Sequence, residues 1–296
     1  MLTESQRYAI QRCGVATLHD YRTVSPMSGE AFLEDGILFY YDGRMLLVCA
    51  QPLRDARSLR AARTRELVLR FVDRHAVDSV LYVGGEPLSL RELRSRNFFD
   101  DGVQRRRARA AELFLPIREA YRSPRLSRLY RRATRNGFAA RCRAGGMVDA
   151  SLLTLAETFY AGLPLSEYLA ELAVTLSLTL MLPEVTIIEA WDRGAVRGFV
   201  TVHEPFDGVS VALFMAHDRV TRGVSDFLYS QLIDHARARN SEFVNVGPSA
   251  SEGHYRFKRK WRGVPLVPPY YAATWRRRGA RCTRHRTWLL RILGRN

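Results

Sequence analysis

Residues 255–263 read YRFKRKWRG, and this segment holds both lysines of the chain, Lys258 and Lys260. Apart from the histidines, every other basic side chain is arginine. Arginine keeps its charge at any useful pH, whereas lysine is a compact donor whose pKa falls on burial and which can release a proton. Two rare residues can also fall together by chance. The residues around the pair favour the interpretation that arginine cannot substitute here.

A helix over this segment would separate its residues into two faces. Phe257 and Trp261 are four positions apart, so they share one face and would anchor the helix in a core. Lys258 lies about 100° around the axis from Phe257, grouped with Tyr255 and Arg262. The pattern therefore predicts that Lys258 faces a cleft.

The second half of the chain places this helix near the end of a regular series of elements. Three strands form a meander with Asp-Arg-Gly and Phe-Asp-Gly turns, and a helix capped by Ser225 follows them. The series predicts helices over 152–160 and 166–182, strands over 185–191, 196–203 and 209–216, the capped helix, a strand over 242–247, the lysine helix ending before Gly263, and a strand over 270–275.

The first half shows a similar order. Asp42-Gly43 is a hairpin signal between two apolar runs. We expect strands over 37–41 and 44–50, a helix over 58–75, and strands over 79–83 and 112–117. The repeated order predicts an α/β protein of two tandem, related domains with mixed, mainly antiparallel sheets flanked by helices.

An arginine-rich helix is expected between the halves. Ser123 is its predicted N-cap, Pro124 its first helical residue, and Asn136-Gly137 its end. It would present an arginine stripe; a merely solvated face is the alternative. We therefore expect domains over 1–122 and 138–278, a connecting helix over 123–137, and a basic tail over 279–296 that could pack on the first domain.

Positive charge is concentrated in two blocks. The net charge is +16, yet residues 253–296 contain thirteen Arg or Lys and no acidic residue, and residues 105–143 contain thirteen Arg against two Glu. The remainder of the chain is therefore net acidic. Two basic blocks on an acidic body indicate an extended polyanion as partner, either nucleic acid or an anionic membrane surface. Charge that serves solubility alone is the simpler alternative.

Cysteine content and hydropathy indicate a cytoplasmic protein. The four cysteines show neither metal spacing nor a disulfide framework, and no apolar run reaches the roughly 18 residues of a membrane span. The N-terminus lacks the layout of a secretory signal. No Ser-His-Asp order, Walker loop, zinc pattern or dinucleotide glycine signature occurs, so we expect no metal, no cofactor and a non-covalent mechanism.

The order of elements in the second half resembles the GNAT acyltransferase fold, and its end resembles one branch of it. That branch comprises the aminoacyl-tRNA-dependent transferases with tandem GNAT domains: the Fem peptidoglycan-bridge enzymes, their antibiotic-pathway relatives, and the catalytic domain of phosphatidylglycerol lysyltransferases. In these families a strand ending near N/D-x-G precedes a (L/Y)-x-x-F-K-x-x-(F/W)-G/P segment. This chain supplies the strand end 245–249 and then Tyr255, Phe257, Lys258, Trp261 and Gly263, with Arg262 before the glycine.

The resemblance implies an aminoacyl transfer from tRNA to an amine or hydroxyl acceptor. Negative charge then develops on the ester carbonyl oxygen and on the departing ribose oxygen. The Lys258 ammonium would stabilise both and could protonate the leaving group, with Phe257 positioning it. The acceptor could be a peptide-like metabolite, as in antibiotic biosynthesis, a peptidoglycan precursor or a lipid. Lys258 as one more charge of a basic tail is the plainer alternative.

Further residues are assigned as binding candidates. The expected substrate-binding set joins groups at strand ends with one tyrosine of the lysine helix and one that could line the substrate groove: Asn245, Ser249, His217, Asp218, Tyr255 and Tyr270. The basic blocks give the expected tRNA-binding set: Arg125, Arg128, Arg132, Arg135, Arg256, Arg259, Lys260, Arg262, Arg276, Arg277 and Arg278. The tail could instead contact a membrane surface.

Two alternatives of other kinds stay open. Acyl-CoA-dependent GNAT enzymes carry an Arg/Gln-x-x-Gly-x-Gly/Ala turn whose N–H groups hold a pyrophosphate. In the matching stretch, 219–225, the glycine is shifted by one position from the motif, and Ser225 stands in place of a small apolar residue. Both differences weaken the hypothesis of an acyl-CoA donor. A non-catalytic module that binds RNA or anionic lipid is the other alternative.

Overall fold

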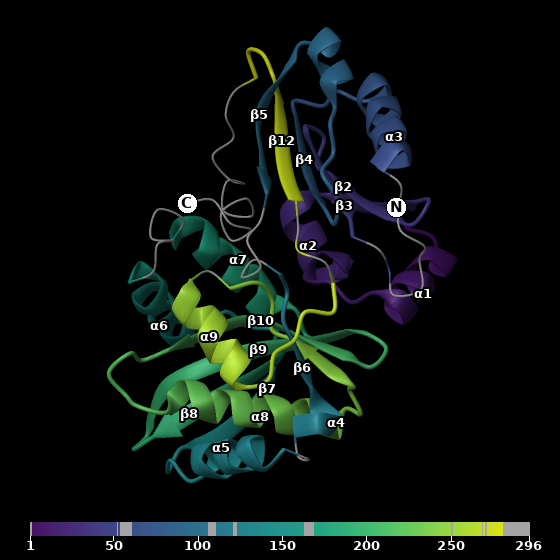
Figure 1. The fold of residues 1–296 in the computed structure, drawn as a ribbon. Helices are drawn as coiled ribbons and strands as arrows, with labels where there is room; N and C mark the ends of the chain where they lie inside the picture. The colour runs from purple at the N-terminus through teal and green to yellow at the C-terminus, as the bar shows by residue number, and fades with distance from the viewer. Residues whose placement is uncertain are drawn as a thin grey trace. The chain divides into compact units, whose positions relative to one another are not determined.

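Two six-stranded sheets form the framework of the chain, which we describe from a computed structural model (Figure 1). The structure describes residues 2–51, 53, 61–105, 111–120, 123–162, 169–249, 251–267, 269 and 271–280. The chain divides into two units, one of residues 1–112 with 267–296 and one of residues 113–266.

The first unit contains the sheet β1-β2-β3-β4-β12-β5. Its parallel pair, β3 and β4, is joined by helix α3, and the other neighbouring strands run antiparallel. Its elements are α1 (Glu4–Cys13), α2 (Tyr21–Ser28), β1 (Glu30–Glu34), β2 (Ile37–Tyr41), β3 (Met45–Ala50), α3 (Ala61–Arg74), β4 (Ser79–Gly84), β5 (Phe98–Arg105) and β12 (Tyr271–Arg277), with short 3-10 turns at Thr17–His19 and Arg91–Arg96.

The second unit contains the sheet β6-β11-β10-β9-β8-β7. Here β10 and β11 are the parallel pair, and helix α8 joins them. The elements are β6 (Phe114–Pro116), α4 (Ile117–Ala120), α5 (Pro124–Thr134), β7 (Ala139–Ala144), α6 (Ala150–Ala161), α7 (Leu169–Met181), β8 (Thr186–Asp192), β9 (Ala195–Phe206), β10 (Val209–His217), α8 (Val224–Ala238), β11 (Phe243–Asn245) and α9 (Glu252–Lys260).

Helices cover both faces of the second sheet. Successive residues of a strand point to opposite faces, and β8 shows this directly. Ile187 packs in a core with Leu152 and Leu180 of α6 and α7, whereas Ile188 packs in another with Phe227 of α8. The α6–α7 face and the α8 face are therefore separate layers on one sheet.

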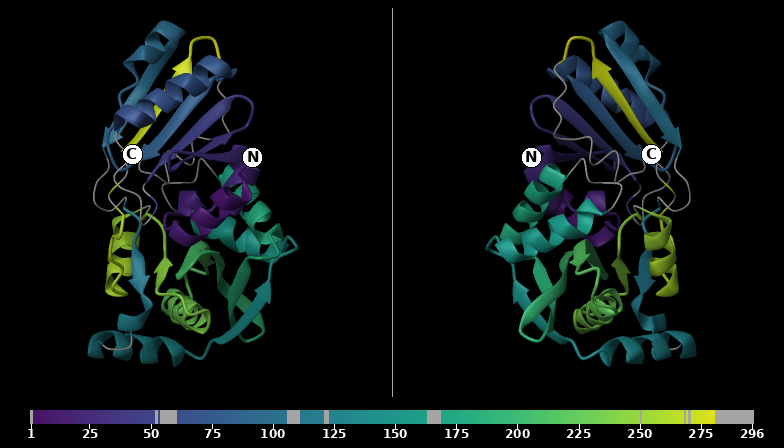
Figure 2. Two further views of the ribbon diagram at one scale, coloured as in Figure 1. Left: turned by 90° about the vertical axis from the view of Figure 1, so that its right-hand side faces the viewer. Right: turned by 90° about the vertical axis from the view of Figure 1, so that its left-hand side faces the viewer.

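Two strands pair in a different sheet from the one that the order of the sequence predicts. The strand predicted over 270–275 is β12, the yellow strand of Figure 2, and it lies between β4 and β5 of the first sheet. Its Trp275 is 3% exposed and belongs to the core of that sheet. The strand predicted over 112–117 is β6, which pairs with β11 of the second sheet. Each unit therefore takes up a strand that the sequence order had assigned elsewhere.

Helix α5 belongs to the second unit. Leu126 and Ala133 are buried in the core that α8 shares, and Tyr130 donates a hydrogen bond of 2.5 Å to Asp234. Its apolar face is thus explained by packing on α8, beside which it lies in Figure 1. The expected boundaries at 122 and 138 accordingly differ from the observed one at residue 113.

The parallel pair of the second sheet opens into a fork. β10 and β11 pair only from Val209 to Val211 and from Phe243 to Asn245, while β10 runs on to His217 beside β9. In open α/β sheets, ligands bind beyond the carboxyl ends of parallel strands. The residues after β10 and β11 are therefore where a ligand site is expected.

Candidate functional site

Helix α9 is the next element after β11, the second branch of the fork. Ser251 caps it by accepting a hydrogen bond of 3.2 Å from the His254 N–H group. Phe257 and Trp261 both pack against Tyr229 of α8, with ring centroids 4.7 and 5.8 Å away. The face predicted to anchor the helix does so, and Trp261 is 1% exposed.

The half-buried ammonium of Lys258 is held by the chain that leaves β11. Its Nζ donates to the carbonyl oxygens of Val246, Gly247 and Pro248 at 2.5, 3.1 and 2.7 Å. An ammonium has three N–H donors, so these three carbonyls match them in number. A planar guanidinium could not converge on the same three oxygens, which gives a physical reason for lysine at this position.

Lys260 occupies a different environment. Its Nζ lies 2.7 and 2.8 Å from the two carboxylate oxygens of Asp226, and Trp261 donates to the same carboxylate at 3.0 Å. Lys260 therefore ties α9 to the first turn of α8. This ion pair competes with its expected role as a phosphate contact.

On the other branch of the fork, His217 ends β10 and contacts α8. Its Nε2 lies 2.8 Å from Ser225 Oγ, and its Nδ1 lies 2.9 Å from the carbonyl oxygen of Asp218. Ser225 was expected to cap α8, but the N-cap is Gly223, whose φ of +87° places it in the left-handed region. Ser225 is instead the second helical residue, so its hydroxyl is free to point at His217.

Phe159 of α6 connects the two branches. Its ring lies 4.7 Å from the His217 ring and, in a parallel arrangement, 6.3 Å from the His254 ring. Arg219 lies over the same ring at 5.2 Å and donates to the Phe159 carbonyl oxygen at 2.5 Å. The sequence reading missed Phe159, because an aromatic residue at helical spacing is most often core.

Both histidines are held neutral. Burial, and then the nearby charge of Lys258, lower the pKa of His254 from 6.5 to about 4. Burial also lowers the pKa of His217, against the hydrogen bond to Asp218. Two uncharged imidazoles beside a lysine provide proton acceptors at neutral pH.

Asp218 organises the turn that follows β10. Its carboxylate accepts hydrogen bonds from the Val220 N–H group and the Thr221 hydroxyl, both at 2.8 Å, and lies 3.5 Å from Arg197. Burial alone would raise the pKa of Asp218, but these partners hold it below its ordinary value. The carboxylate thus serves the fold of the turn.

The β11 branch holds two more predicted residues. Asn245 is fully buried, and its Oδ1 accepts from the Gly247 N–H group at 2.8 Å, which shapes the turn below Lys258. Ser249 is 6% exposed, and its Oγ has no hydrogen-bond partner among the described residues. A buried hydroxyl without a partner suits a contact to a bound molecule.

The remaining predicted residues are dispersed. Tyr255 packs against the core that contains Trp261, and Tyr270 lies outside the described residues. The expected arginines of the second unit are exposed on and just after α5 and α9, at Arg125, Arg128, Arg132, Arg135, Arg256, Arg259 and Arg262. Arg276, Arg277 and Arg278 are at the end of β12, in the first unit.

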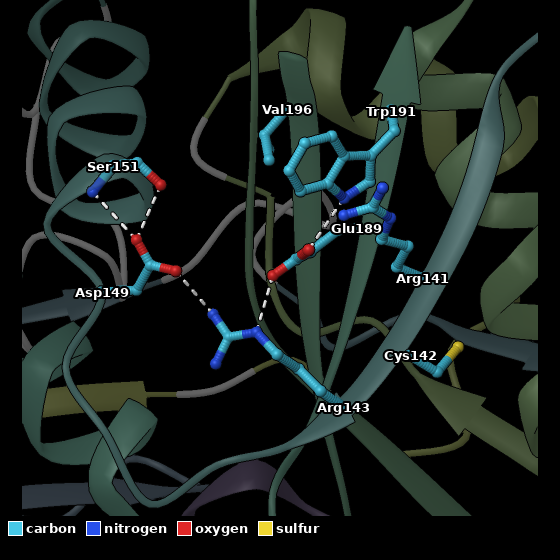
Figure 3. A pocket seen from close by; sticks show the side chains of 8 residues that line it. All are labelled: Arg141, Cys142, Arg143, Asp149, Ser151, Glu189, Trp191 and Val196. Atoms are coloured by element: carbon cyan, nitrogen blue, oxygen red, sulfur yellow. Dashed lines mark hydrogen bonds and ion pairs between the residues drawn. The ribbon is translucent and has the colours of Figure 1, made fainter. Parts of the chain in front are cut away.

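A separate pocket of about 520 Å³ opens at the β7 edge of the second sheet (Figure 3). Buried Glu189 accepts from Arg143 and from the Trp191 indole, each at 2.8 Å, and Arg143 also binds Asp149. Arg141 stacks over Trp191 at 3.9 Å. Its acidic side chains, Glu189 and Asp149, are both paired with Arg143 within the pocket.

In the described ranges, no group of three or more His, Cys, Asp or Glu side chains is arranged to hold a metal ion. Within the same ranges, no helix combines the length and hydropathy that a bilayer crossing requires.

Comparisons with known proteins show the fold. No protein-family model matches the sequence, and no curated protein matches it in sequence. The structure is similar to L-PGS from Bacillus licheniformis, with a TM-score of 0.52 and 14% identity over 99% of this chain and 98% of that one. It is also similar to FemX, with a TM-score of 0.55 and 10% identity over 91% and 95%.

A third similar structure is the C-terminal domain of a candidate lysylphosphatidylglycerol synthetase from Agrobacterium fabrum. Its TM-score is 0.51, with 15% identity over 88% of this chain and 87% of that domain. The expected resemblance in fold is confirmed, and the fold class is α/β, with two units that each contain a mixed sheet flanked by helices.

Proposed function

We propose that the protein is an acyltransferase that moves an aminoacyl group from aminoacyl-tRNA to an amine or hydroxyl acceptor, in the cytoplasm and without a resident cofactor. The observation that carries the proposal is the half-buried Lys258 ammonium, which lies at the β11 branch of the fork. The resemblance of its segment to the Phe-Lys motif and the shared fold support it.

The ammonium would act on charge that develops during transfer. A tetrahedral intermediate places negative charge on the ester carbonyl oxygen, and its collapse moves that charge to the ribose oxygen. All three N–H donors of Lys258 face carbonyl oxygens in the structure, so direct donation requires exchange of one of them. The Gly247 carbonyl, at 3.1 Å, is the longest contact and the one we expect to exchange.

Ser249 would provide the adjoining substrate contact. Its Oγ lacks a partner in the described chain and follows Pro248, whose carbonyl oxygen binds Lys258. A hydroxyl can donate to a carbonyl or accept from an ammonium, both of which an aminoacyl ester offers.

Two features of the fork argue against acyl-CoA as the donor. The N–H groups of a pyrophosphate-binding turn must be open to the ligand, but Asp218 already occupies the Val220 N–H group with a carboxylate. On the part of β10 that runs beyond its pairing with β11, the Met215 carbonyl accepts from the Tyr160 hydroxyl at 3.1 Å, so it is not open to an amide of the donor. Burial raises the pKa of Tyr160, which keeps this hydroxyl a donor.

The exposed arginines would bind the tRNA backbone. Arg262, which follows α9, donates to Ser123 at the start of α5 at 3.3 Å, so the cationic residues of the two helices adjoin. Phosphate contacts of this kind give affinity that falls steeply with salt. The acceptor could be a peptide-like metabolite, a peptidoglycan precursor or a lipid at a membrane surface.

One observation favours a second candidate, a non-catalytic module that binds RNA or anionic lipid. The three carbonyl partners of Lys258 would also suit a purely structural lysine. Incubation with a mixture of charged tRNAs separates the candidates. Acyl transfer predicts discharge of at least one tRNA; salt-dependent binding without discharge favours the second, and turnover of acetyl-CoA alone favours a CoA-dependent enzyme.

A further inference from the structure

Ser225 and His217 form a hydroxyl–imidazole pair beside Phe159. Ser225 Oγ is 2.8 Å from His217 Nε2, and both residues are half-buried. A nucleophile in hydrogen-bond contact with a base, which a third group orients, is the arrangement of a covalent acyl-transfer site. The third group here is the Asp218 carbonyl oxygen, 2.9 Å from Nδ1.

The direction of the hydrogen bond between Ser225 and His217 follows from the other partner of the imidazole. A carbonyl oxygen only accepts, so Nδ1 of His217 carries the proton of the neutral ring. Nε2 then has a lone pair, and the Ser225 hydroxyl must donate to it. Burial disfavours the charged ring, so this protonation state holds at neutral pH.

The surroundings fix the pair and favour negative charge on Ser225. Phe159 packs against the imidazole at 4.7 Å, and Arg219 secures the position of Phe159 through its carbonyl oxygen. Ser225 lies in the first turn of α8, where the positive end of the helix dipole stabilises an oxyanion.

Another serine of the second unit, Ser151, serves as a comparison, because it has the same position in its helix. Ser151 is also the second residue of its helix, α6, and its hydroxyl donates to the capping carboxylate of Asp149 at 2.6 Å. It has the same helix position but an acid as partner in place of an imidazole. Helix position alone therefore does not explain the pairing of Ser225.

We propose that Ser225 carries the acyl group between donor and acceptor, with His217 as its base. This inference rests on the proposed acyl transfer, divides it into two steps, and replaces the non-covalent mechanism that the sequence led us to expect. In the first, a bond forms between Ser225 Oγ and the acyl carbon, the bond from that carbon to the donor oxygen breaks, and the Ser225 proton passes through His217 Nε2 to the departing oxygen.

In the second step, the acceptor nitrogen or oxygen attacks the Ser225 ester. The acceptor proton goes to His217 Nε2 and returns to Ser225 Oγ as the ester bond breaks. The first step exchanges one ester for another and the second forms an amide or ester, so neither step needs an oxidant or a further co-reactant.

The reactivity of Ser225 can be tested on the intact protein without any substrate. A fluorophosphonate forms a P–O bond with an activated serine and releases fluoride, and peptide mass spectrometry locates the adduct. We expect an adduct at Ser225 in the wild type and in Ser151→Ala, and none at residue 225 in Ser225→Ala. His217→Gln should slow labelling by about 100-fold, because the base is lost. A folded wild type that labels elsewhere or not at all would overturn the inference.

The acyl step is tested with charged tRNA that carries a labelled amino acid, in the absence of acceptor. An acid-stable, hydroxylamine-labile adduct at Ser225 is the expected product. The same adduct from an acyl-CoA but not from tRNA would contradict the proposed donor and leave Ser225 as the acyl carrier. Transfer at an unchanged rate by Ser225→Ala, with its melting temperature preserved, would overturn the covalent step while sustaining aminoacyl transfer.

Discussion

Lys260 and Asp226 form an ion pair, with Nζ 2.7 Å from Oδ1, that joins α9 to the first turn of α8. The other lysine, Lys258, binds the three carbonyl oxygens after β11. The two lysines of the chain therefore hold α9 to the start of α8 and to the backbone that follows β11. Lys260 stabilises the helix position, and Lys258 presents its charge at the end of β11.

The Lys260–Asp226 ion pair predicts that its two residues contribute unequally to the free energy of unfolding. Asp226→Ala removes the acceptor of both Lys260 and the buried Trp261 indole, whose side chain is 1% exposed. An unsatisfied buried donor costs about 1–3 kcal/mol, whereas a partly exposed ion pair contributes up to about 1 kcal/mol. We expect Asp226→Ala to lower the free energy of unfolding more than Lys260→Ala, by denaturant titration. Asp226→Asn, which can still accept from Trp261, should fall between them; equal losses for all three would contradict the contact.

The backbone at the start of α8 predicts a sensitive glycine. Gly223 has a φ of +87°, and a Cβ there would lie 2.4 Å from Asn136 Nδ2. Gly223→Ala should combine left-handed strain of about 1 kcal/mol with this clash. Gly194→Ala is the control, because its φ is +80° and a Cβ there meets nothing within 4 Å. We expect a clearly lower melting temperature for Gly223→Ala than for Gly194→Ala, and equal values would contradict the position of α8.

The low pKa of His254 predicts acid sensitivity. An unfolded chain binds a proton at this ring as the pH falls through 6.5, whereas the folded chain does so only near 4. Stability from this group is present above pH 6.5 and is lost as the pH falls towards 4, because the unfolded state binds more protons. His254→Gln should therefore lose less stability than the wild type between pH 7 and 5, measured by urea titration. His75→Gln, in the first unit, controls for the loss of a histidine; no difference between the two variants would refute the shift.

The arginines of α5 predict a salt effect. Each phosphate contact adds about 0.7–0.9 to the slope of log affinity against log salt. Replacing four residues with alanine, namely Arg125, Arg128, Arg132 and Arg135, should reduce that slope by roughly 3 for tRNA. The charge-matched control replaces four first-unit arginines that pair with acidic residues, namely Arg44, Arg63, Arg65 and Arg70. Equal slopes for both variants would remove α5 from the tRNA surface.

Local patterns predicted the fold better than they predicted sheet membership. The hairpin at Asp42-Gly43 was placed within one residue, because alternation and turn chemistry act over a few positions. The strand at 270–275 was found, but its neighbours β4 and β5 are about 170–190 residues away along the chain. Such long-range pairing leaves no mark in the local sequence.

The candidate site also divides into features that a local pattern predicts and features that depend on the path of the backbone. The Phe257–Trp261 spacing predicted how α9 is anchored, because both residues share one helix face. The contact between Ser225 and His217 depends instead on Gly223 in the left-handed region and on the turn that Asp218 folds. The carbonyl partners of Lys258 likewise depend on the path of residues 246–248, which no side-chain pattern records.

The role of Lys258 is tested most directly by the rate at which the protein discharges aminoacyl-tRNA. Lys258→Met should lower that rate by about 100-fold or more, as loss of one oxyanion donor does, while Lys260→Met should stay within a few-fold of the wild type. Lys258→Arg should not restore the rate, because a guanidinium does not fit the three carbonyls. A wild-type rate in folded Lys258→Met, or discharge of acyl-CoA in place of tRNA, would contradict the account.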